Sequence, residues 1–177
     1  LHQRPDHILV GEIRTDPAVV RTFFQAVGTG HAGFTTFHAE SARDALRRLR
    51  HDPLSVPDEL LTDIDIISTQ RLLTLGDERV RRTRGLTELR EAEDGTPALR
   101  EVFTHDPADD AVEQVESSAV LGEVAEAQGW STADLETELR RRRRVLGALL
   151  AEGTTGYETV TRWLFRFARD PERTMDD

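Results

Sequence analysis

The sequence predicts an α/β fold with a parallel sheet, extended by antiparallel strands and followed by a helical region. Over the first 50 residues, two short apolar runs alternate with two segments of helical periodicity, a pattern typical of parallel strand–helix units. The middle of the chain carries apolar runs separated by glycine-containing turns, and its last third carries capped helical patterns. The length of 177 residues suits one domain, or one domain with a small appendage.

The first strand–helix unit begins at residues 8–13, whose short apolar run is typical of a strand buried on both faces of a sheet. Asp16 then fits a helix N-cap, and Pro17 fits the first helical position. The apolar residues that follow recur at helical spacing and form one stripe: Val20, Phe23, Phe24 and Val27. Gly28 and Gly30 end this predicted helix.

The second unit repeats the pattern with a predicted strand at residues 32–37. Ser41 fits the next N-cap, with Asp44 three residues further on, and Leu46 and Leu49 lie on the side expected to be buried. Two such units alone would leave the sheet short and its edges open.

The middle of the chain predicts antiparallel strands that extend the edge of this sheet. We expect a loop at residues 54–61, held by Pro53 and Pro57, and then a strand from Ile64 toward Leu75. The next elements are a hairpin turn at 76–77, a returning strand at 80–89, a turn at 95–97 and a strand at 99–103.

The character of the sequence changes at residue 105, and we predict two parts, residues 1–104 and residues 105–177. The first part has a net charge of -3 and the second a net charge of -7. The second part is expected to be helical throughout, with helices at 118–128 and 131–152 and a last helix opened by a capping box at 155–158. The predicted buried stripe of the helix at 131–152 consists of Leu135, Leu139, Leu146, Leu149 and Leu150. That of the last helix consists of Tyr157, Val160, Trp163, Leu164 and Phe167.

All 23 basic residues are arginine, and the chain contains neither Lys nor Cys. The lack of Lys excludes Schiff-base chemistry, a catalytic lysine and the lysine of a phosphate-binding loop. The lack of Cys excludes thiolate catalysis, thiolate metal sites and disulfides.

The formal net charge of -10 argues against a general partner of nucleic acids or of anionic membranes. The acidic composition fits a halophilic protein, which its carboxylates keep soluble in a high-salt cytoplasm. A GC-rich codon bias is an alternative explanation for the replacement of Lys by Arg. No apolar run approaches the roughly 18 residues of a membrane-spanning helix, and we expect neither such a helix nor a signal peptide.

Glu12 ends the first predicted strand and is the strongest candidate for a functional carboxylate. Ligands of α/β proteins bind at the carboxyl ends of parallel strands, and in nucleotide hydrolases an acid at this place orients Mg²⁺ or the attacking water. The alternative is a surface glutamate at the end of a buried strand.

His31 and His38 flank the second predicted strand. Their spacing of seven residues puts them on opposite faces of a regular strand, and no third ligand stands at zinc spacing. We therefore expect one histidine to point into a site and the other to pack or cap, rather than a shared metal. Thr35 and Thr36 offer hydroxyls to a phosphate or metal, or simply reflect strand propensity. The four remaining histidines, which have no partner in register, are expected on the surface: His2, His7, His51 and His105.

Five consecutive arginines stand at residues 140–144. Successive helical residues turn by about 100°, so this run surrounds a helix and does not line one face for nucleic acid. Glu136 and Glu138 precede Arg140 and Arg142 by four residues, which favours ion pairs along a solvated helix.

Together, these pieces resemble the type II/IV secretion-system assembly ATPases, RecA-like P-loop motors that power secretion, type IV pili and archaella. The likeness is to the archaeal branch in particular. Residues 4–14 resemble the family's Walker B strand, and residues 24–49 resemble its histidine box with the helix that follows. Residues 56–61, the segment leading to Asp65 and the helical tail continue the likeness over nearly the whole chain.

The resemblance implies roles for individual residues. Glu12 would be the Walker B acid that polarises the attacking water or holds the Mg²⁺ shell. His31 and His38 would belong to the histidine box, one of them sensing the terminal phosphate of ATP. Arg4 and Arg14 would be charge-stabilising arginines within reach of a neighbouring subunit's nucleotide. At the position of His2, the family often has a further arginine.

The large departure from the family is the absence of the nucleotide-cradling loop G-x-x-x-x-G-K-[ST] and of the acidic box. The chain is therefore expected to correspond to the C-terminal part of a RecA-like core with its helical region, and to bind ATP poorly by itself. The intact motor would be a cytoplasmic homo-hexamer at the inner face of the membrane, working with Mg²⁺ and ATP on a membrane platform protein and not on nucleic acid. The alternatives are a non-catalytic module that binds a full-length motor or platform protein, and an acidic scaffold unrelated to ATPases.

Overall fold

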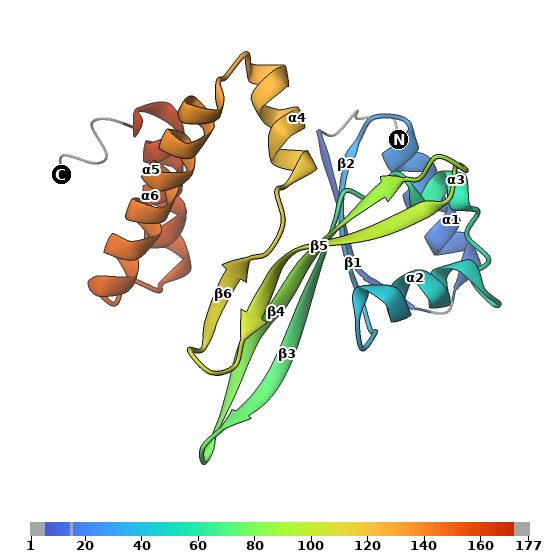
Figure 1. Ribbon diagram of the computed structural model, residues 1–177, viewed down its shortest axis with the longest axis horizontal. Coiled ribbons are helices and arrows are strands. Elements are labelled where there is room, and N and C mark those ends of the chain that lie inside the picture. The colour runs from blue at the N-terminus through green and yellow to red at the C-terminus, as the bar shows by residue number, and fades with distance from the viewer. Residues whose placement is uncertain (1–5, 15, 172–177) are drawn as a thin grey trace. The chain divides into compact units, whose positions relative to one another are not determined.

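The computed structural model describes residues 6–14 and 16–171 (Figure 1). Its contacts divide the chain into two compact units, Leu1–Val120 and Leu121–Asp177, and each is described by itself. The first unit therefore extends beyond residue 104, where the composition of the sequence changes.

The first unit opens with the two predicted strand–helix pairs. These are β1 (His7–Ile13), α1 (Pro17–Gly28), β2 (Ala32–Phe37) and α2 (Ala42–Arg50). The two strands are parallel, with His7 opposite Ala32 and Ile13 opposite Phe37, which confirms the predicted parallel pairing. The bounds of β2 are those that the sequence predicted.

Both helices begin at the predicted caps. The Asp16 side chain accepts a hydrogen bond from the Ala18 amide at 2.9 Å, and the Ser41 hydroxyl accepts one from the Asp44 amide at 3.1 Å. Each cap satisfies an amide that the first turn of a helix leaves without a partner, so these short polar side chains set where the helices start.

One apolar core holds the first unit together. Its buried members come from both strand–helix pairs, from the segment after α2 and from β4: Ile13, Val20, Phe23, Phe24, Leu46, Leu49, Leu54, Val56, Leu61 and Leu89. Gly33 permits the close approach of β2 to α1, because a Cβ atom there would lie 2.4 Å from Cγ2 of Val27 and 3.0 Å from Cζ of Phe23.

A short helix, α3 (Asp58–Leu61), replaces part of the loop that we expected at residues 54–61. Pro57 leads into it in an extended conformation, and two acids occupy its first turn, where a helix dipole favours negative charge. Leu61 is fully buried. Burial of this side chain explains why the segment coils instead of remaining a loop.

Four antiparallel strands follow: β3 (Ile66–Leu75), β4 (Glu78–Glu91), β5 (Pro97–Asp106) and β6 (Ala111–Gln114). They pair in sequence order, with Gly76 at φ 59° in the β3–β4 turn. The expectation that they extend the parallel sheet is wrong, because within the described residues β1 and β2 form one sheet and β3 to β6 another. Leu89, Ile67 and Leu99 join the second sheet to the common core by side-chain packing.

Glu88 of β4 is a buried carboxylate that the sequence did not single out. It is 3% exposed, and it accepts hydrogen bonds from the Ser118 hydroxyl and from the Ala119 amide, the latter at 2.9 Å. This carboxylate therefore caps the first turn of α4 (Ala119–Gln128), a helix whose start lies within the first unit.

The second unit contains the rest of α4 together with α5 (Thr132–Ala151) and α6 (Tyr157–Arg169). At the start of α5 a capping box is present, with hydrogen bonds in both directions between Ser131 and Asp134. The one predicted for α6 is not, because Gly156 is its N-cap and no side chain caps it. The region after residue 105 is also not helical throughout, since it contains the end of β5 and all of β6.

Helices α5 and α6 pack through a small apolar cluster. Its members are Val145, Leu149 and Phe167, with Val160 and Trp163 partly buried against them. The predicted stripes are wrong at five positions, which are exposed: Leu139, Leu146, Leu150, Tyr157 and Leu164. Two packed helices bury one narrow stripe each, and on α5 this stripe contains Val145 and Leu149 but not their neighbours Leu146 and Leu150.

Candidate functional site

The carboxyl ends of β1 and β2 bring three of the predicted site residues together. The Oε2 atom of Glu12 lies 3.0 Å from Nε of Arg14, and its Oε1 atom lies 3.3 Å from Nε2 of His38. The Glu12 side chain is 25% exposed, whereas the side chains of Arg14 and His38 are largely in solvent. The half-buried Glu12 carboxylate thus contacts two exposed side chains, the Arg14 guanidinium and the His38 imidazole.

A local irregularity of the sheet positions Glu12. The pairing of β1 with β2 shifts between Val10 and Ile13, so Gly11 and Glu12 together face a single residue, Thr36. The hydroxyl of Thr36 donates a hydrogen bond of 2.6 Å to the Gly11 carbonyl across this break. Bulges of this kind redirect side chains next to functional sites.

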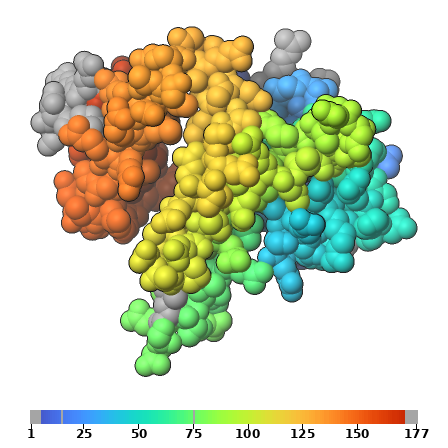
Figure 2. Space-filling view, viewed as in Figure 1, coloured from blue at the N-terminus to red at the C-terminus, as the bar shows by residue number. Residues whose placement is uncertain are grey.

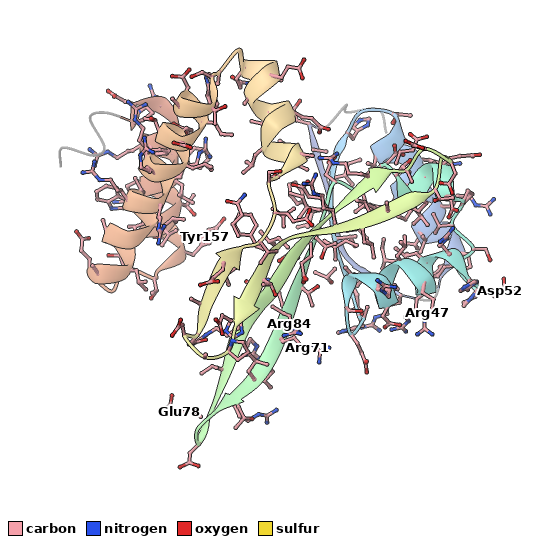
Figure 3. The ribbon with its side chains drawn as sticks, in the orientation of Figure 1. Arg47, Asp52, Arg71, Glu78, Arg84 and Tyr157 are labelled. Carbon is pink, nitrogen blue, oxygen red and sulfur yellow. The ribbon has the colours of Figure 1, made fainter. Side chains whose placement is uncertain are left out.

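Glu12 lies at the edge of a groove of about 640 Å³. The groove runs from the strand ends to α2 and the segment that follows it, and it is lined by Glu12, Ile13, Arg14, Phe37, His38, Arg47, Arg48, His51, Asp52, Pro53 and Leu54. Arg47 and Asp52 are labelled in Figure 3. Three arginines and two histidines face only two acids in this set, so the groove has a positive character on an acidic chain and suits an anionic ligand.

Arg48 stiffens one wall of the groove. Its guanidinium lies 5.5 Å from the centre of the Phe37 ring and donates a hydrogen bond to the backbone carbonyl of His38. Both contacts tie α2 to the end of β2, and they hold the backbone from which the His38 imidazole projects.

His31 lies away from this site. It immediately precedes β2, and its Nδ1 atom is 3.1 Å from the Ala26 carbonyl and 3.2 Å from the Thr29 hydroxyl. A strand of this length separates its ends by about 20 Å, so His31 and His38 cannot share one ligand.

In the described part of the chain, no group of three or more His, Cys, Asp or Glu side chains is arranged to hold a metal ion. Arg4 and His2 fall outside the described residues.

His105 is not on the surface, contrary to our expectation. It is 4% exposed, and its Nε2 atom lies 2.9 Å from Oδ1 of Asp110. Arg82 binds the same carboxylate through Nε at 2.8 Å and Nη2 at 2.6 Å. The Arg82 guanidinium and then the His105 ring hold the pKa of Asp110 well below its usual range. No spacing in the sequence predicts this cluster, because Arg82 and Asp110 are 28 residues apart.

The parallel pair of strands is incompletely covered. Leu9 and Phe34, which are register partners on the face away from α1, are 77% and 58% exposed. On the other face, an apolar groove of about 360 Å³ lies between β1 and α1, lined by Ile8, Val10, Ala18, Val19, Thr22, Phe23 and Ala26. Parallel sheets are normally buried on both faces, so this pair has the character of part of a larger sheet.

In the described residues, no helix is both long and apolar enough to cross a membrane.

Comparison with known proteins gives a family for the chain. The family described as "Type II/IV secretion system protein" matches residues 1–160. An uncharacterized protein of Methanocaldococcus jannaschii is 36% identical over 151 residues, which are 82% of this chain and 54% of that protein. A second uncharacterized protein of that organism is 32% identical over 174 residues, covering 94% of this chain and 31% of its own length.

A relative with a named activity matches a shorter stretch. The type IV pilus assembly ATPase PilB of Pseudomonas aeruginosa is 41% identical over 73 residues, which are 41% of this chain and 12% of that protein. The chain thus spans about half the length, or less, of the curated relatives it matches. By the match over residues 1–160, the chain belongs to the type II/IV secretion system protein family.

Proposed function

We propose that this chain forms the C-terminal part of an ATP-hydrolysing motor that drives protein secretion or the assembly of a pilus or archaellum. The observation that carries the proposal is the position of Glu12, at the carboxyl end of a parallel strand and beside a groove of positive character. The family match and the pilus assembly ATPase among the relatives support the same activity.

In the complete motor, Glu12 would orient the attacking water or hold the water shell of Mg²⁺. A single carboxylate fits that ion, because Mg²⁺ in such sites keeps several waters and takes its other ligands from phosphates. Arg14 and His38 would face the phosphates from the same groove, and His38 would be the histidine-box residue that senses the terminal phosphate. His31 would support the end of α1, and Arg4 remains a predicted charge-stabilising residue.

The groups that grip the nucleotide phosphates would come from elsewhere in the motor. The chain lacks every lysine and the glycine-rich loop whose amides cradle phosphates, so we expect weak binding of ATP by these residues alone. The exposed face of Leu9 and Phe34 and the apolar groove beside β1 are the surfaces on which the rest of a RecA-like core would pack. The motor would work as a cytoplasmic homo-hexamer on a membrane platform protein.

Reconstitution tests this proposal. The chain is mixed with a polypeptide that carries the phosphate-binding loop of a related motor, and ATP hydrolysis is measured with and without Mg²⁺. We expect activity only from the mixture, and its loss when Glu12 is replaced by Gln. A mixture that associates and binds Mg-ATP but hydrolyses none, with either Glu or Gln at position 12, contradicts the proposal.

The second candidate is a non-catalytic module that binds a full-length motor or a platform protein. The exposure of Leu9 and Phe34 favours it, because a partner can bury this face without any nucleotide. A rise in the thermal midpoint of the chain on adding Mg-ATP would contradict the module. If the chain captures a full-length motor and the Glu12→Gln change does not affect this capture, the non-catalytic module is favoured over the catalytic part of a motor.

A further inference from the structure

The loop between β2 and α2 carries His38, one of the residues that line the positive groove. Residues 38–41, here called the histidine loop, join the end of β2 to Ser41, the N-cap of α2. The His38 side chain is 90% exposed, so its place depends on the backbone that carries it. The contacts that hold this backbone therefore set where the imidazole stands relative to Glu12.

The first two turns of α2 hold the histidine loop from one side. The Asp44 carboxylate accepts a hydrogen bond of 3.2 Å from the Glu40 amide, and Nη2 of Arg47 lies 2.6 Å from its Oδ1 atom. The Arg47 guanidinium and then the Glu40 amide hold the pKa of Asp44 below its usual value. One turn further along the helix, Arg48 donates a hydrogen bond to the His38 carbonyl. These contacts are local, because they join residues at most ten positions apart.

A second arginine holds the histidine loop from the other sheet. Arg71 of β3 donates a hydrogen bond from Nη2 to the Glu40 carbonyl, 31 residues away in sequence. Figure 3 labels Arg71 on the ribbon that β3 and β4 form. The described strands make two separate sheets, β1 with β2 and β3 with β4 to β6. This hydrogen bond is therefore a polar link between the loop that carries His38 and the second sheet.

The strand pairing explains why Arg71 turns to this acceptor. Arg71 is the register partner of Arg82 on β4, so the two side chains leave the ribbon from the same face. Like charges directly opposite each other on a sheet are destabilising. Arg82 binds Asp110 through Nε at 2.8 Å and Nη2 at 2.6 Å, whereas Arg71 binds the Glu40 carbonyl. The two guanidinium groups are thus held by different partners.

The ribbon that carries Arg71 extends beyond the rest of the first unit. Strand β4 pairs with β5 only from Gly85 to Glu91, so residues 71–82 form a two-stranded ribbon. Figure 2 shows the end of this ribbon protruding from the first unit. A two-stranded ribbon is held by few contacts, so a partner displaces it more easily than the sheet behind it. Arg71 lies where the ribbon leaves the sheet, and a displacement there reaches the histidine loop.

We propose that Arg71 is a positioning residue for His38, which holds the histidine loop by the Glu40 carbonyl and couples the β3–β4 ribbon to the groove. With the loop backbone held by Arg48 and Arg71, the imidazole alone moves between Glu12 and a ligand. A shift of the ribbon pulls on the loop or releases it, and His38 then loses its place. The catalytic meaning of this coupling rests on the proposed ATPase function, whereas the tether itself is a property of the chain without nucleotide.

Backbone order in the histidine loop tests the tether in the chain alone. Order parameters from amide nitrogen relaxation should be about 0.85 for residues 38–40 of the unmodified chain, as in rigid backbone. In Arg71→Met, which keeps an unbranched side chain without a donor, they should fall below about 0.6. Arg71→Lys keeps a cationic donor and should leave the loop ordered.

Arg81→Met is the matched control. It removes the same charge from the same ribbon, and Arg81 is exposed, with no hydrogen bond or ion pair of its side chain among the described residues. This variant should leave the order of the histidine loop unchanged. Circular dichroism of each variant checks that the fold is kept.

The reconstituted motor gives a second measurement. Arg71→Met should lower kcat by about tenfold and leave KM for ATP nearly unchanged, because a misplaced side chain affects the chemical step more than nucleotide binding. Arg71→Lys should recover most of the turnover. If the unmodified mixture hydrolyses no ATP, the proposed function fails, and the order parameters still decide whether the tether exists.

Three outcomes would overturn the proposal. One is a histidine loop that stays equally ordered in Arg71→Met. The second is a loss of order in Arg81→Met as large as that in Arg71→Met, which would assign the effect to a general weakening of the ribbon. The third is a folded Arg71→Lys variant whose loop is as disordered as that of Arg71→Met. An active motor combined with any of these results leaves the ATPase function standing and removes the tether alone.

Discussion

The Oε1 atom of Glu12 lies 3.3 Å from Nε2 of His38. The Glu12 side chain is 25% exposed and the His38 side chain 90% exposed. The imidazole is therefore the partner that can turn into solvent or toward a ligand while the carboxylate keeps its place. This arrangement allows a histidine to exchange contact with a carboxylate for contact with a phosphate.

In a reconstituted motor, the Glu12→Gln variant should lose turnover by about 100-fold or more, because an amide cannot accept the proton of a water or support a cation in the same way. Nucleotide binding should change little. His38→Ala should also reduce turnover, whereas His31→Ala should act mainly on stability, because His31 contacts the end of α1. Steady-state hydrolysis and equilibrium nucleotide binding separate these effects. Equal loss of turnover in the His31 and His38 variants, with unchanged stability, would contradict these assignments.

The packing of β2 on α1 predicts that Gly33→Ala destabilises the first unit by about 1–3 kcal/mol, because the added methyl overlaps Val27. Gly11 in the neighbouring strand is the matched control, since a Cβ atom there meets nothing within 4 Å. Urea denaturation followed by circular dichroism measures both variants. If Gly11→Ala costs as much as Gly33→Ala, close packing is not the cause.

The Asp110 cluster predicts a loss of stability in strong acid. The pKa of Asp110 in the folded chain lies below its usual value of 3.8, held down by Arg82 and then by His105. The unfolded chain therefore binds the proton more readily, so the stabilisation is fully present above pH 3.8 and is lost as the pH falls through the folded pKa.

Asp110→Asn should lower stability at neutral pH and flatten the dependence of the free energy of unfolding on pH below 3.8. Asp109→Asn changes an exposed neighbour and should leave both unchanged. Denaturant titrations at several pH values provide the comparison. An acid dependence that is the same in all three proteins would contradict the role of Asp110.

The capping box of α5 predicts that Ser131→Ala lowers the stability of the second unit by about 0.5–2 kcal/mol, because the Asp134 amide loses its acceptor. Ser131→Gly should cost less, since glycine is well tolerated at an N-cap. Both tryptophans, Trp130 and Trp163, belong to the second unit, so their fluorescence during denaturation reports on it. Equal costs of the Ala and Gly variants would contradict a capping effect.

Local features of the fold were predictable from short stretches of sequence. The caps at Asp16 and Ser41 and the bounds of β2 agree with the structure, because each depends on side chains within a few residues of the element. The sequence alone likewise excludes a lysine that binds the nucleotide phosphates, because the chain contains no Lys. The predicted place of Glu12 at the end of β1 followed from the apolar run before it.

Only the tertiary structure decided which distant groups meet. It buries His105 against Asp110, and Glu88 against the start of α4. The members of these pairs are too far apart along the chain, or too irregularly spaced, to produce a periodic pattern in the sequence. It also places β3 to β6 in a sheet of their own and selects Val145 over Leu146 for the contact between α5 and α6. Sequence periodicity identifies a face of an element, but burial depends on the surface that packs against it, and that surface is supplied by residues far away in the chain.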